Sequence, residues 1–330
     1  MTEKKEGYLI TSSPHLFSPA TTPKIMYAVI ATLLPVAVVS VLLFGKKVLL
    51  LYLVSIVTAL VTEAVVKKVR RQSIRSIYDG SAVITGLLLV MVVPPDLSPI
   101  FVGLGAFVAI FIGKEVFGGL GANIFNPALV GRAFLSASYP VQMTTYSQPA
   151  SVFPVAGGVD AAGGATPLAA ARFEGVITPT DSLLFGQIGG SIGETSALLI
   201  ILGGLVLVAL KIVDWRLVLS YLGTVFLLTG LFYLIDPGTY SPPLFHLFSG
   251  GLMLGAFYMA TDMSTSPYTR WGNVIFGLGA GLIVVVIRLF GGFPEGVMYS
   301  ILLMNAVTPL INRYTLPKTF GEQTGKGAGA

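Results

Sequence analysis

A long polar segment, residues 138–194, interrupts an otherwise apolar sequence and carries the position best suited to covalent chemistry. Connections of this length are uncommon and are either functional or disordered, and we interpret this one as functional. Thr166 follows Gly164 and Ala165, whose small side chains let an enzyme or a phosphate group approach the backbone. Its hydroxyl could be esterified by the phosphate of FMN, and Pro167 could begin a helix that faces this phosphate. Taken alone, the tripeptide is more typical of a flexible Gly/Ala loop than of an attachment site.

Two amide side chains three residues apart, Asn123 and Asn126, stand at the start of a short apolar run, residues 124–137. Residues with this spacing lie on one face of a helix. Together they could form hydrogen bonds with the edge of a flavin ring, which displays both donors and acceptors. The alternative is that the amides cap a helix broken inside the membrane, where backbone groups lack partners. The sequence leaves both interpretations open.

Acidic residues beside apolar runs are the third group of candidates. Asp262 follows a short apolar run and precedes the hydroxyl-bearing residues 264–266. Carboxylate and hydroxyl oxygens suit a small hard cation, and ionisable groups at membrane depth are functional hypotheses by default. Asp262 is therefore the candidate for an ion pathway, with an interfacial acid in contact with water as the alternative. For Asp79, which lies beside a basic loop, we prefer the interfacial interpretation.

Other charged and polar residues are expected to have structural roles. Glu63, Lys114 and Glu115 stand near the ends of apolar runs, where long charged side chains usually reach out to water. His246 is expected to be an interfacial hydrogen-bonding residue. No residue of the chain is predicted to be catalytic, and none is predicted to bind a metal ion.

The elements that position these residues must be membrane helices. Of the 330 residues, 54% are hydrophobic and 11% are charged, whereas a soluble domain carries about 25% charged residues. The bilayer is therefore the expected solvent. The chain has no cysteine, which excludes thiolate-bound iron–sulfur clusters and disulfides, and its 2 histidines argue against a two-histidine haem. The net charge of +5 comes from basic residues beside apolar runs, which set orientation and do not indicate nucleic acid.

About ten apolar runs predict an all-α polytopic membrane protein. A run of fourteen residues reaches only about 21 Å, less than the roughly 30 Å hydrocarbon core, so several runs are expected to be half-helices or broken spans. The runs are residues 25–44, 48–66, 80–93, 99–117, 124–137, 195–213, 215–235, 245–260, 273–289 and 296–311.

The two halves of the chain resemble each other. Gly-Leu-Gly-Ala at 103–106 precedes Phe-Gly-Gly at 117–119, and the same two motifs recur at 277–280 and 290–292. Equivalent helices are five apart, an odd number, so the second copy should cross the membrane in the opposite sense, as in urea transporters. A chance match of glycine-rich apolar sequence is the alternative. The expected domains are an N-terminal arm 1–22, two inverted five-helix repeats 23–137 and 195–312, the connecting segment 138–194, and a tail 313–330.

Charge predicts the orientation. A basic cluster at residues 67–75 places that loop in the cytoplasm. Counting spans from there puts both termini in the cytoplasm and segment 138–194 outside, where Arg172 is its one basic residue. The first twenty residues contain no apolar stretch of the kind that a cleaved signal peptide has.

Five sequence blocks carry a family resemblance: Ser13-Pro14-His15, DGSAVITGLLL at 79–89, FGGLGANIFNPALVGRAFL at 117–135, IGETSAL at 192–198 and MATDMSTSP at 259–267. With them, the chain resembles the D subunit of the Rnf ion-translocating electron transport complex and its relative, the B subunit of the sodium-translocating NADH:quinone reductase. The flavin motif of that family is Asp-x-x-Ser/Thr-Gly-Ala-Thr. Asp160, Gly164, Ala165 and Thr166 match it, and Gly163 stands where Ser or Thr is usual.

The resemblance implies a set of cofactors and partners. It implies FMN bound covalently to Thr166 by a flavin transferase, and a second, non-covalent riboflavin near Asn123 and Asn126. It also implies a bacterial cytoplasmic (inner) membrane location, contact with lipid, and a complex with the other Rnf subunits (A, B, C, E and G). Within that complex, this subunit would pass electrons through its flavins and help to couple their flow to export of Na⁺ or H⁺.

Two other functions remain open from the sequence. One is a passive channel or secondary transporter with the same inverted repeat and no redox role. The other is the equivalent subunit of a quinone-reducing complex, although the short stretch before the first apolar run favours the Rnf type.

Overall fold

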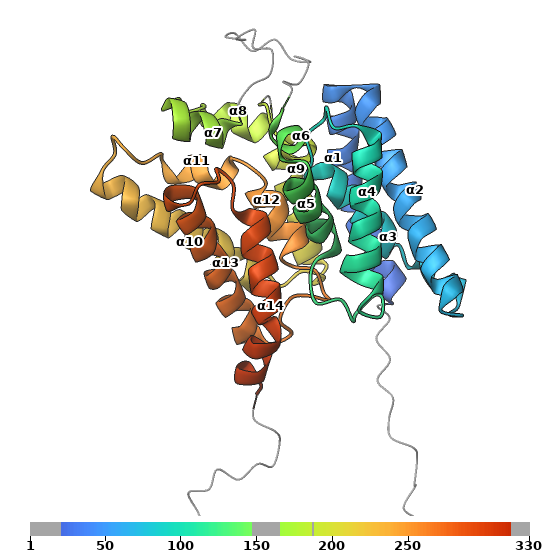
Figure 1. Ribbon diagram of the computed structural model, residues 1–330. Helices are drawn as coiled ribbons and strands as arrows, with labels where there is room; N and C mark the ends of the chain where they lie inside the picture. The colour runs from blue at the N-terminus through green and yellow to red at the C-terminus, as the bar shows by residue number, and fades with distance from the viewer. Residues whose placement is uncertain (1–20, 147–165, 187, 318–330) are drawn as a thin grey trace, which may run out of the picture.

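The computed structural model describes residues 21–146, 166–186 and 188–317. Thr166 is the first described residue after a gap, and Asp160, Gly163, Gly164 and Ala165 of the predicted motif lie outside the described residues. Across the described ranges the chain is helical and has no β-strand, which confirms the predicted all-α class. Figure 1 shows the helices as one bundle with a layer of short helices across its upper end.

The first half of the chain forms the helices that the apolar runs predict. Proline or a helix-capping residue begins several of them: Pro99 opens one helix and Asn126 caps another. The elements are α1 Thr22–Phe44, α2 Lys46–Val69, the 3₁₀-helix η1 Ile74–Asp79, α3 Ser81–Met91, α4 Pro99–Ile110 with its π-helical extension η2 Phe111–Glu115, and α5 Pro127–Ser138.

The second half has a similar order of long and short helices, but its π-helical extension follows a different helix. The apolar run at 245–260 forms two short helices, because the chain breaks at Gly250, where a φ of 69° favours glycine, and this agrees with the expectation that several runs are broken. The elements are α9 Ala197–Ala209, α10 Trp215–Ile235, α11 Pro243–Phe248, α12 Leu252–Leu254 with its π-helical extension η5 Gly255–Met259, α13 Arg270–Phe290 and α14 Val297–Thr315.

The connecting segment contains short helices in its described parts. They are α6 Pro140–Thr144, α7 Pro167–Ala169, the π-helical η3 Ala170–Glu174, α8 Thr180–Phe185 and the 3₁₀-helix η4 Ile192–Thr195. A helix thus begins at Pro167, as predicted. In Figure 1, α6, α7 and α8 lie at the upper end, whereas the start of α1 and the end of α14 lie at the lower end.

Within the described residues, four helices are long and apolar enough to cross a membrane: α1, α2, α10 and α13. Their outward side chains are apolar and exposed, for example Leu42 at 66% and Leu227 at 70%. A surface of this kind fits lipid as its solvent. The α3 helix, with 11 residues, is too short to span alone, in agreement with the predicted broken helices.

The glycines of the repeated Gly-Leu-Gly-Ala motif make equivalent contacts in both halves. Gly103 of α4 faces α2, and Gly277 of α13 faces α10. Gly105 faces α5, where an added methyl group would lie 2.6 Å from Leu135 Cδ1. Gly279 faces α14, where it would lie 2.7 Å from Met304 Sδ. In each half, therefore, the first glycine faces one neighbouring helix and the second faces another, on corresponding elements.

Candidate functional site

The threonine singled out by the sequence lies on a cavity at the upper end of the bundle. Thr166 is the N-cap of α7, where its Oγ1 accepts a hydrogen bond from the backbone N–H of Ala169 at 3.3 Å. The side chain is half-buried. The adjoining cavity has a volume of about 260 Å³ and is lined by Thr144, Tyr146, Thr166, Leu168, Ala169, Phe173, Glu194, Gly250, Pro294 and Glu295. We call it the outer cavity.

An ion pair between the buried Arg132 and the half-buried Glu295 lies at the wall of the outer cavity. Arg132 of α5 donates from Nη2 to Glu295 Oε2 at 2.6 Å, and the other oxygen of Glu295 accepts from the N–H of Gly251 at 2.8 Å. Burial would raise the pKa of Glu295, but Arg132, the Gly251 amide and Arg288 outweigh it and hold this pKa below its ordinary value. Glu295 is therefore the ionised carboxylate of the pair.

The second carboxylate of the outer cavity has a different environment. Glu194 is buried, and its Oε2 has no hydrogen-bond partner among the described residues. Burial, followed by the negative charge of Glu295, raises the pKa of Glu194 above its ordinary value. The resemblance includes the sequence block that contains Glu194, but nothing in its spacing indicates that this carboxyl faces Thr166.

His246 corrects one sequence prediction. Its ring is buried, and in the described part of the chain neither ring nitrogen has a hydrogen-bond partner. The prediction of an interfacial hydrogen-bonding histidine is therefore wrong. The backbone of His246 does accept a hydrogen bond. Arg288 Nη1 donates to the carbonyl of His246 at 2.5 Å, and Arg288 Nη2 donates to the carbonyl of Ser249 at 3.0 Å. Arg288 thus holds the break between α11 and α12.

A second, smaller cavity lies between the two halves, and the remaining predicted site residues meet there. Asn123, Asn126 and Asp262 all line it, with Lys114 beside them. Its volume is about 70 Å³. Sequence reasoning treats the two asparagines and the aspartate as separate candidates, and the fold brings them together. We call this space the central cavity.

Asn126 acts as a helix cap. Its side-chain oxygen accepts from the N–H groups of Ala128 at 3.0 Å and Leu129 at 3.3 Å, and its Nδ2 donates to Met259 O at 3.1 Å. Asn123 lies in the turn before α5, where its oxygen accepts from Gly121 N. The expectation that both amides share one helix face is therefore wrong, because α5 begins only at Pro127.

These observations bear on the predicted riboflavin. A cavity of about 70 Å³ has room for a few water molecules and not for a three-ring flavin. The amide of Asn126 is also committed to protein partners on both its oxygen and its nitrogen. The residues around the central cavity therefore do not fit riboflavin.

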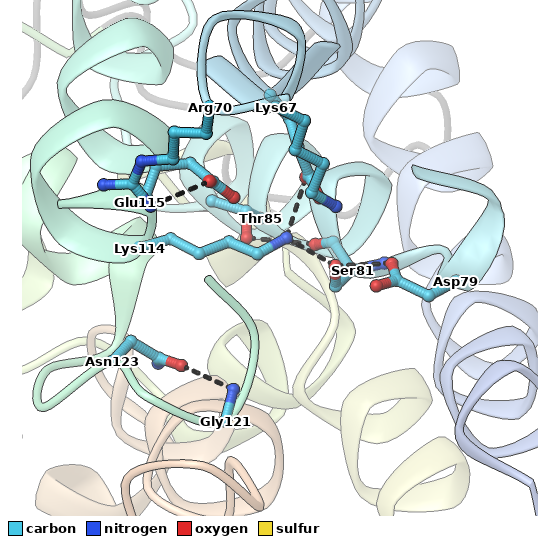
Figure 2. A network of polar contacts seen from close by, with 10 residues as sticks. Lys67, Arg70, Asp79, Ser81, Thr85, Lys114, Glu115, Gly121 and Asn123 are labelled. Atoms are coloured by element: carbon cyan, nitrogen blue, oxygen red, sulfur yellow. Dashed lines mark hydrogen bonds and ion pairs between the residues drawn. The ribbon is translucent and has the colours of Figure 1, made fainter. Parts of the chain in front are cut away.

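The acids near the central cavity form local hydrogen bonds. Asp262 is half-buried, with Oδ1 accepting from Ser264 N at 3.4 Å and Oδ2 from the Thr265 hydroxyl at 3.3 Å. Asp79 accepts from both the N–H and the hydroxyl of Ser81, at 2.8 and 2.6 Å. The Ser81 hydroxyl also accepts from Lys114 Nζ at 2.6 Å, which links Asp79 to the wall of the central cavity (Figure 2).

A buried charge network replaces the predicted snorkelling side chains. The carboxylate of Glu63, on α2, accepts hydrogen bonds from Lys114 Nζ at 2.7 Å and from Lys67 Nζ. Glu115 is buried, with Arg70 Nη1 at 3.8 Å (Figure 2). The prediction that Glu63, Lys114 and Glu115 reach water is wrong, because all three are buried where the π-helical turn η2 packs against α2. The sequence shows no sign of this turn.

Comparison with known proteins now identifies the family. Residues 9–321 match the NQR2, RnfD, RnfE family. The chain belongs to this family. The match confirms the resemblance found in the sequence blocks, and it covers both halves and the segment that carries Thr166.

Relatives from the NQR2, RnfD, RnfE family match nearly end to end. The D subunit of a proton-translocating ferredoxin:NAD(+) oxidoreductase complex from Clostridium ljungdahlii is 47% identical, over 96% of this chain and 97% of its own. The D subunit of the Na(+)-translocating complex from Acetobacterium woodii is 42% identical, over 94% and 95%. The D subunit of an ion-translocating oxidoreductase complex from Stutzerimonas stutzeri is 40% identical, over 92% and 93%.

Proposed function

We propose that this chain is the flavin-carrying membrane subunit of an ion-translocating ferredoxin:NAD⁺ oxidoreductase complex. Support comes from the relatives, two of which are named as the D subunits of such complexes and match over nearly their whole length. In this proposal the chain is a component of an oxidoreductase and carries electrons without a complete active site of its own.

One observation carries the flavin part of the proposal: Thr166 lies on a cavity large enough to receive part of a cofactor. FMN, when bound, supplies one- and two-electron transfer at its ring system. The Thr166 hydroxyl is half-buried at the wall of a cavity of about 260 Å³. Tyr146 and Phe173 offer aromatic surface for a ring, whereas the carboxylates of Glu194 and Glu295 disfavour a phosphate deep inside. Thr166 would therefore bear the phosphoester, and Tyr146 and Phe173 would hold the ring.

The membrane frame in this proposal is an inverted repeat of residues 23–137 and 195–312. Two pairs of glycines support it: Gly103 and Gly277 face corresponding helices in the two halves, and so do Gly105 and Gly279. The basic end of α2, with Lys67 and Lys68, supports cytoplasmic termini and an extracytoplasmic connecting segment. The outer cavity would then open on the outside of the bacterial inner membrane.

The central cavity is the proposed part of the ion path. It lies between the two halves and brings Asp262 near Lys114, Asn123 and Asn126. Oxygens of Asp262 and Thr265, and the hydroxyl of Ser81, are groups that a small cation or a proton can use. Moving one charge against about 100 mV costs about 2.3 kcal/mol. The relatives include one complex named for protons and one for Na⁺, and we propose export of one of these two ions.

Partners must supply the reactions at either end of the electron path. The sequence has no glycine-rich dinucleotide loop after a strand, and it has no cysteine for an iron–sulfur cluster. We therefore propose that the other Rnf subunits (A, B, C, E and G) bind ferredoxin and NAD and complete the electron path. A separate flavin transferase would attach FMN to Thr166.

Intact-protein mass tests the flavin assignment. The protein is produced in a host with the transferase and in one without it. We expect the mass of one FMN phosphoester, and fluorescence that survives denaturing electrophoresis, only in the first host. Thr166→Ala should remove both, and Thr144→Ala, which changes another threonine on the same cavity, should remove neither. A bare, non-fluorescent wild-type chain from the transferase host would contradict the proposal and favour a channel or transporter without a redox role.

A further inference from the structure

The outer cavity contains a carboxyl group with an unpaired oxygen. Glu194 is 9% exposed, and its Oε2 has no hydrogen-bond partner in the described ranges. This oxygen lies against Gly190, where an added methyl group would come within 2.5 Å of it. The absence of a side chain at Gly190 therefore leaves room for this oxygen, and the donors that act on the carboxyl are the hydroxyl and the N–H of Ser191.

Charged groups around Glu194 come from several elements, and within the described ranges none of the basic groups forms an ion pair with it, although the charge of Arg132 acts on it from a distance. Glu295, in the loop between α13 and α14, adds a second negative charge. Arg132 of α5 is bonded to Glu295, and Arg288 of α13 is bonded to the carbonyl groups of His246 and Ser249. Among the described residues, the phenol of Tyr146 is a further titratable group on which the charge of Glu194 acts. Of the two carboxyls, Glu194 is therefore the one that gains most from a proton.

The same cavity includes Thr166, which the proposed function assigns to FMN. A phosphodiester on Thr166 adds one negative charge to the cavity, and reduction of a flavin ring adds another. Negative charges that share a site with little water repel each other strongly, and the weakest acid among the carboxyls responds by binding a proton.

We propose that Glu194 is the proton-accepting residue of the flavin on Thr166, binding one proton each time this flavin receives two electrons. The inference rests on the proposed function. The electrons come from a reduced flavin or iron–sulfur donor in a partner subunit, which is oxidised by two electrons. One proton binds the ring nitrogen, and one forms an O–H bond at the Glu194 carboxylate. The charge of the cavity is then unchanged, and both protons leave when the flavin is reoxidised.

Redox titration of the covalently bound FMN at several pH values tests this role. The wild-type protein should take up two protons for two electrons, and Glu194→Gln only one. Since a tenfold change in equilibrium constant corresponds to 29.6 mV for a two-electron couple, the variant should lose about 30 mV per pH unit of slope. Glu174→Gln is the matched control, because Glu174 is exposed on η3 in the same segment, and its slope should equal that of the wild type.

Infrared difference spectra give a second readout that needs no variant. Wild-type protein labelled with ¹³C-glutamate should gain a protonated carboxyl band when the flavin is reduced. This measurement decides the question if Glu194→Gln does not accumulate. FMN present with no such band, or with an unaltered slope in the variant, overturns the role of Glu194 and leaves the proposed function intact. A wild-type chain without FMN overturns both.

Discussion

The backbone N–H of Asn126 donates to the side-chain oxygen of Asn305 at 3.2 Å, across 179 positions of the chain. Asn305 in turn donates from Nδ2 to Thr265 O at 3.3 Å. Both asparagines are buried. These contacts join α5 of the first half to α14 of the second beside the central cavity, so they fix the walls of that cavity and the relative position of the two halves.

Replacing Asn126 should therefore cost more than replacing its neighbour Asn123. Asn126→Ala removes the cap of α5, worth about 1 kcal/mol, and leaves the buried carbonyl of Met259 without its donor, worth about 1–3 kcal/mol more. Asn123 is equally buried but bonds only within its own turn, so Asn123→Ala should cost about 1 kcal/mol or less. Thermal unfolding in detergent measures both, and equal losses would contradict a joining role for Asn126.

The buried charge network predicts a non-additive pair. Lys114→Met should destabilise the protein by about 3 kcal/mol, since Glu63 loses one of its two cations in a buried site. Combining it with Glu63→Gln should recover part of this loss, because the carboxylate that lost a cation is gone, although the buried Lys67 then loses its partner. Lys47→Met removes a cation from an exposed pair with Asp96 and should change stability by less than about 1 kcal/mol. Chemical unfolding of the four proteins tests this, and additive losses would argue against direct coupling.

Hydropathy predicts the fold well because the bilayer imposes it. Ten apolar runs are expected, and a helix lies at each of them, although the run at 245–260 is divided at Gly250. The local signals Asn126-Pro127 and Thr166-Pro167 each mark the start of a helix. Caps and prolines act through their immediate neighbours, so the sequence suffices to find them.

The arrangement of the sites could not be predicted in the same way. Glu194 and Glu295 share a cavity although they are far apart in sequence, and Lys114 is buried on a π-helical turn, η2. Such relationships depend on long-range packing and on helix irregularities, for which the sequence carries no periodic signal. For the same reason, the capping and ligand interpretations of Asn126 could not be separated before its partners were known.

The stability of flavin-free protein should reveal Glu194 through its pH dependence. The pKa of Glu194 is raised in the folded state, mainly by burial, so the folded chain holds this proton more tightly than the unfolded chain does. The contribution of Glu194 to the free energy of unfolding is therefore complete at low pH. It is lost as pH rises from the ordinary pKa of glutamate through the raised pKa of Glu194. Glu194→Gln should lack this loss. Glu295 has a lowered pKa, so its contribution to stability is lost as pH falls, and this residue is present in both proteins. Melting curves from about pH 4 to 8 therefore compare the contribution of Glu194 in the two proteins.

An ion role of Asp262 can be separated from flavin binding. In the intact complex, Asp262→Asn should raise the cation concentration that gives half-maximal transport on the order of tenfold, equivalent to about 1.4 kcal/mol of binding free energy. The FMN mass on Thr166 should stay the same, because the two cavities share no lining residue. Asp236→Asn is the control, since Asp236 is exposed after α10 and lines neither cavity. Unchanged ion dependence in Asp262→Asn would remove this residue from the path.

Equivalent glycines of the two halves should respond differently to the same substitution. A methyl group at Gly277 would lie 2.7 Å from the carbonyl oxygen of Leu217, a backbone atom of α10 that cannot move without separating the helices. Gly277→Ala should therefore destabilise the protein by about 1–3 kcal/mol. At Gly103 the nearest atoms are side-chain atoms of α2 at 3.6 Å, an ordinary contact, so Gly103→Ala should be neutral or gain up to about 1 kcal/mol from helix propensity. Thermal unfolding of the two variants compares them directly. An equal loss would mean that α4 approaches α2 as closely as α13 approaches α10, so that the repeat has the same helix spacing in both halves.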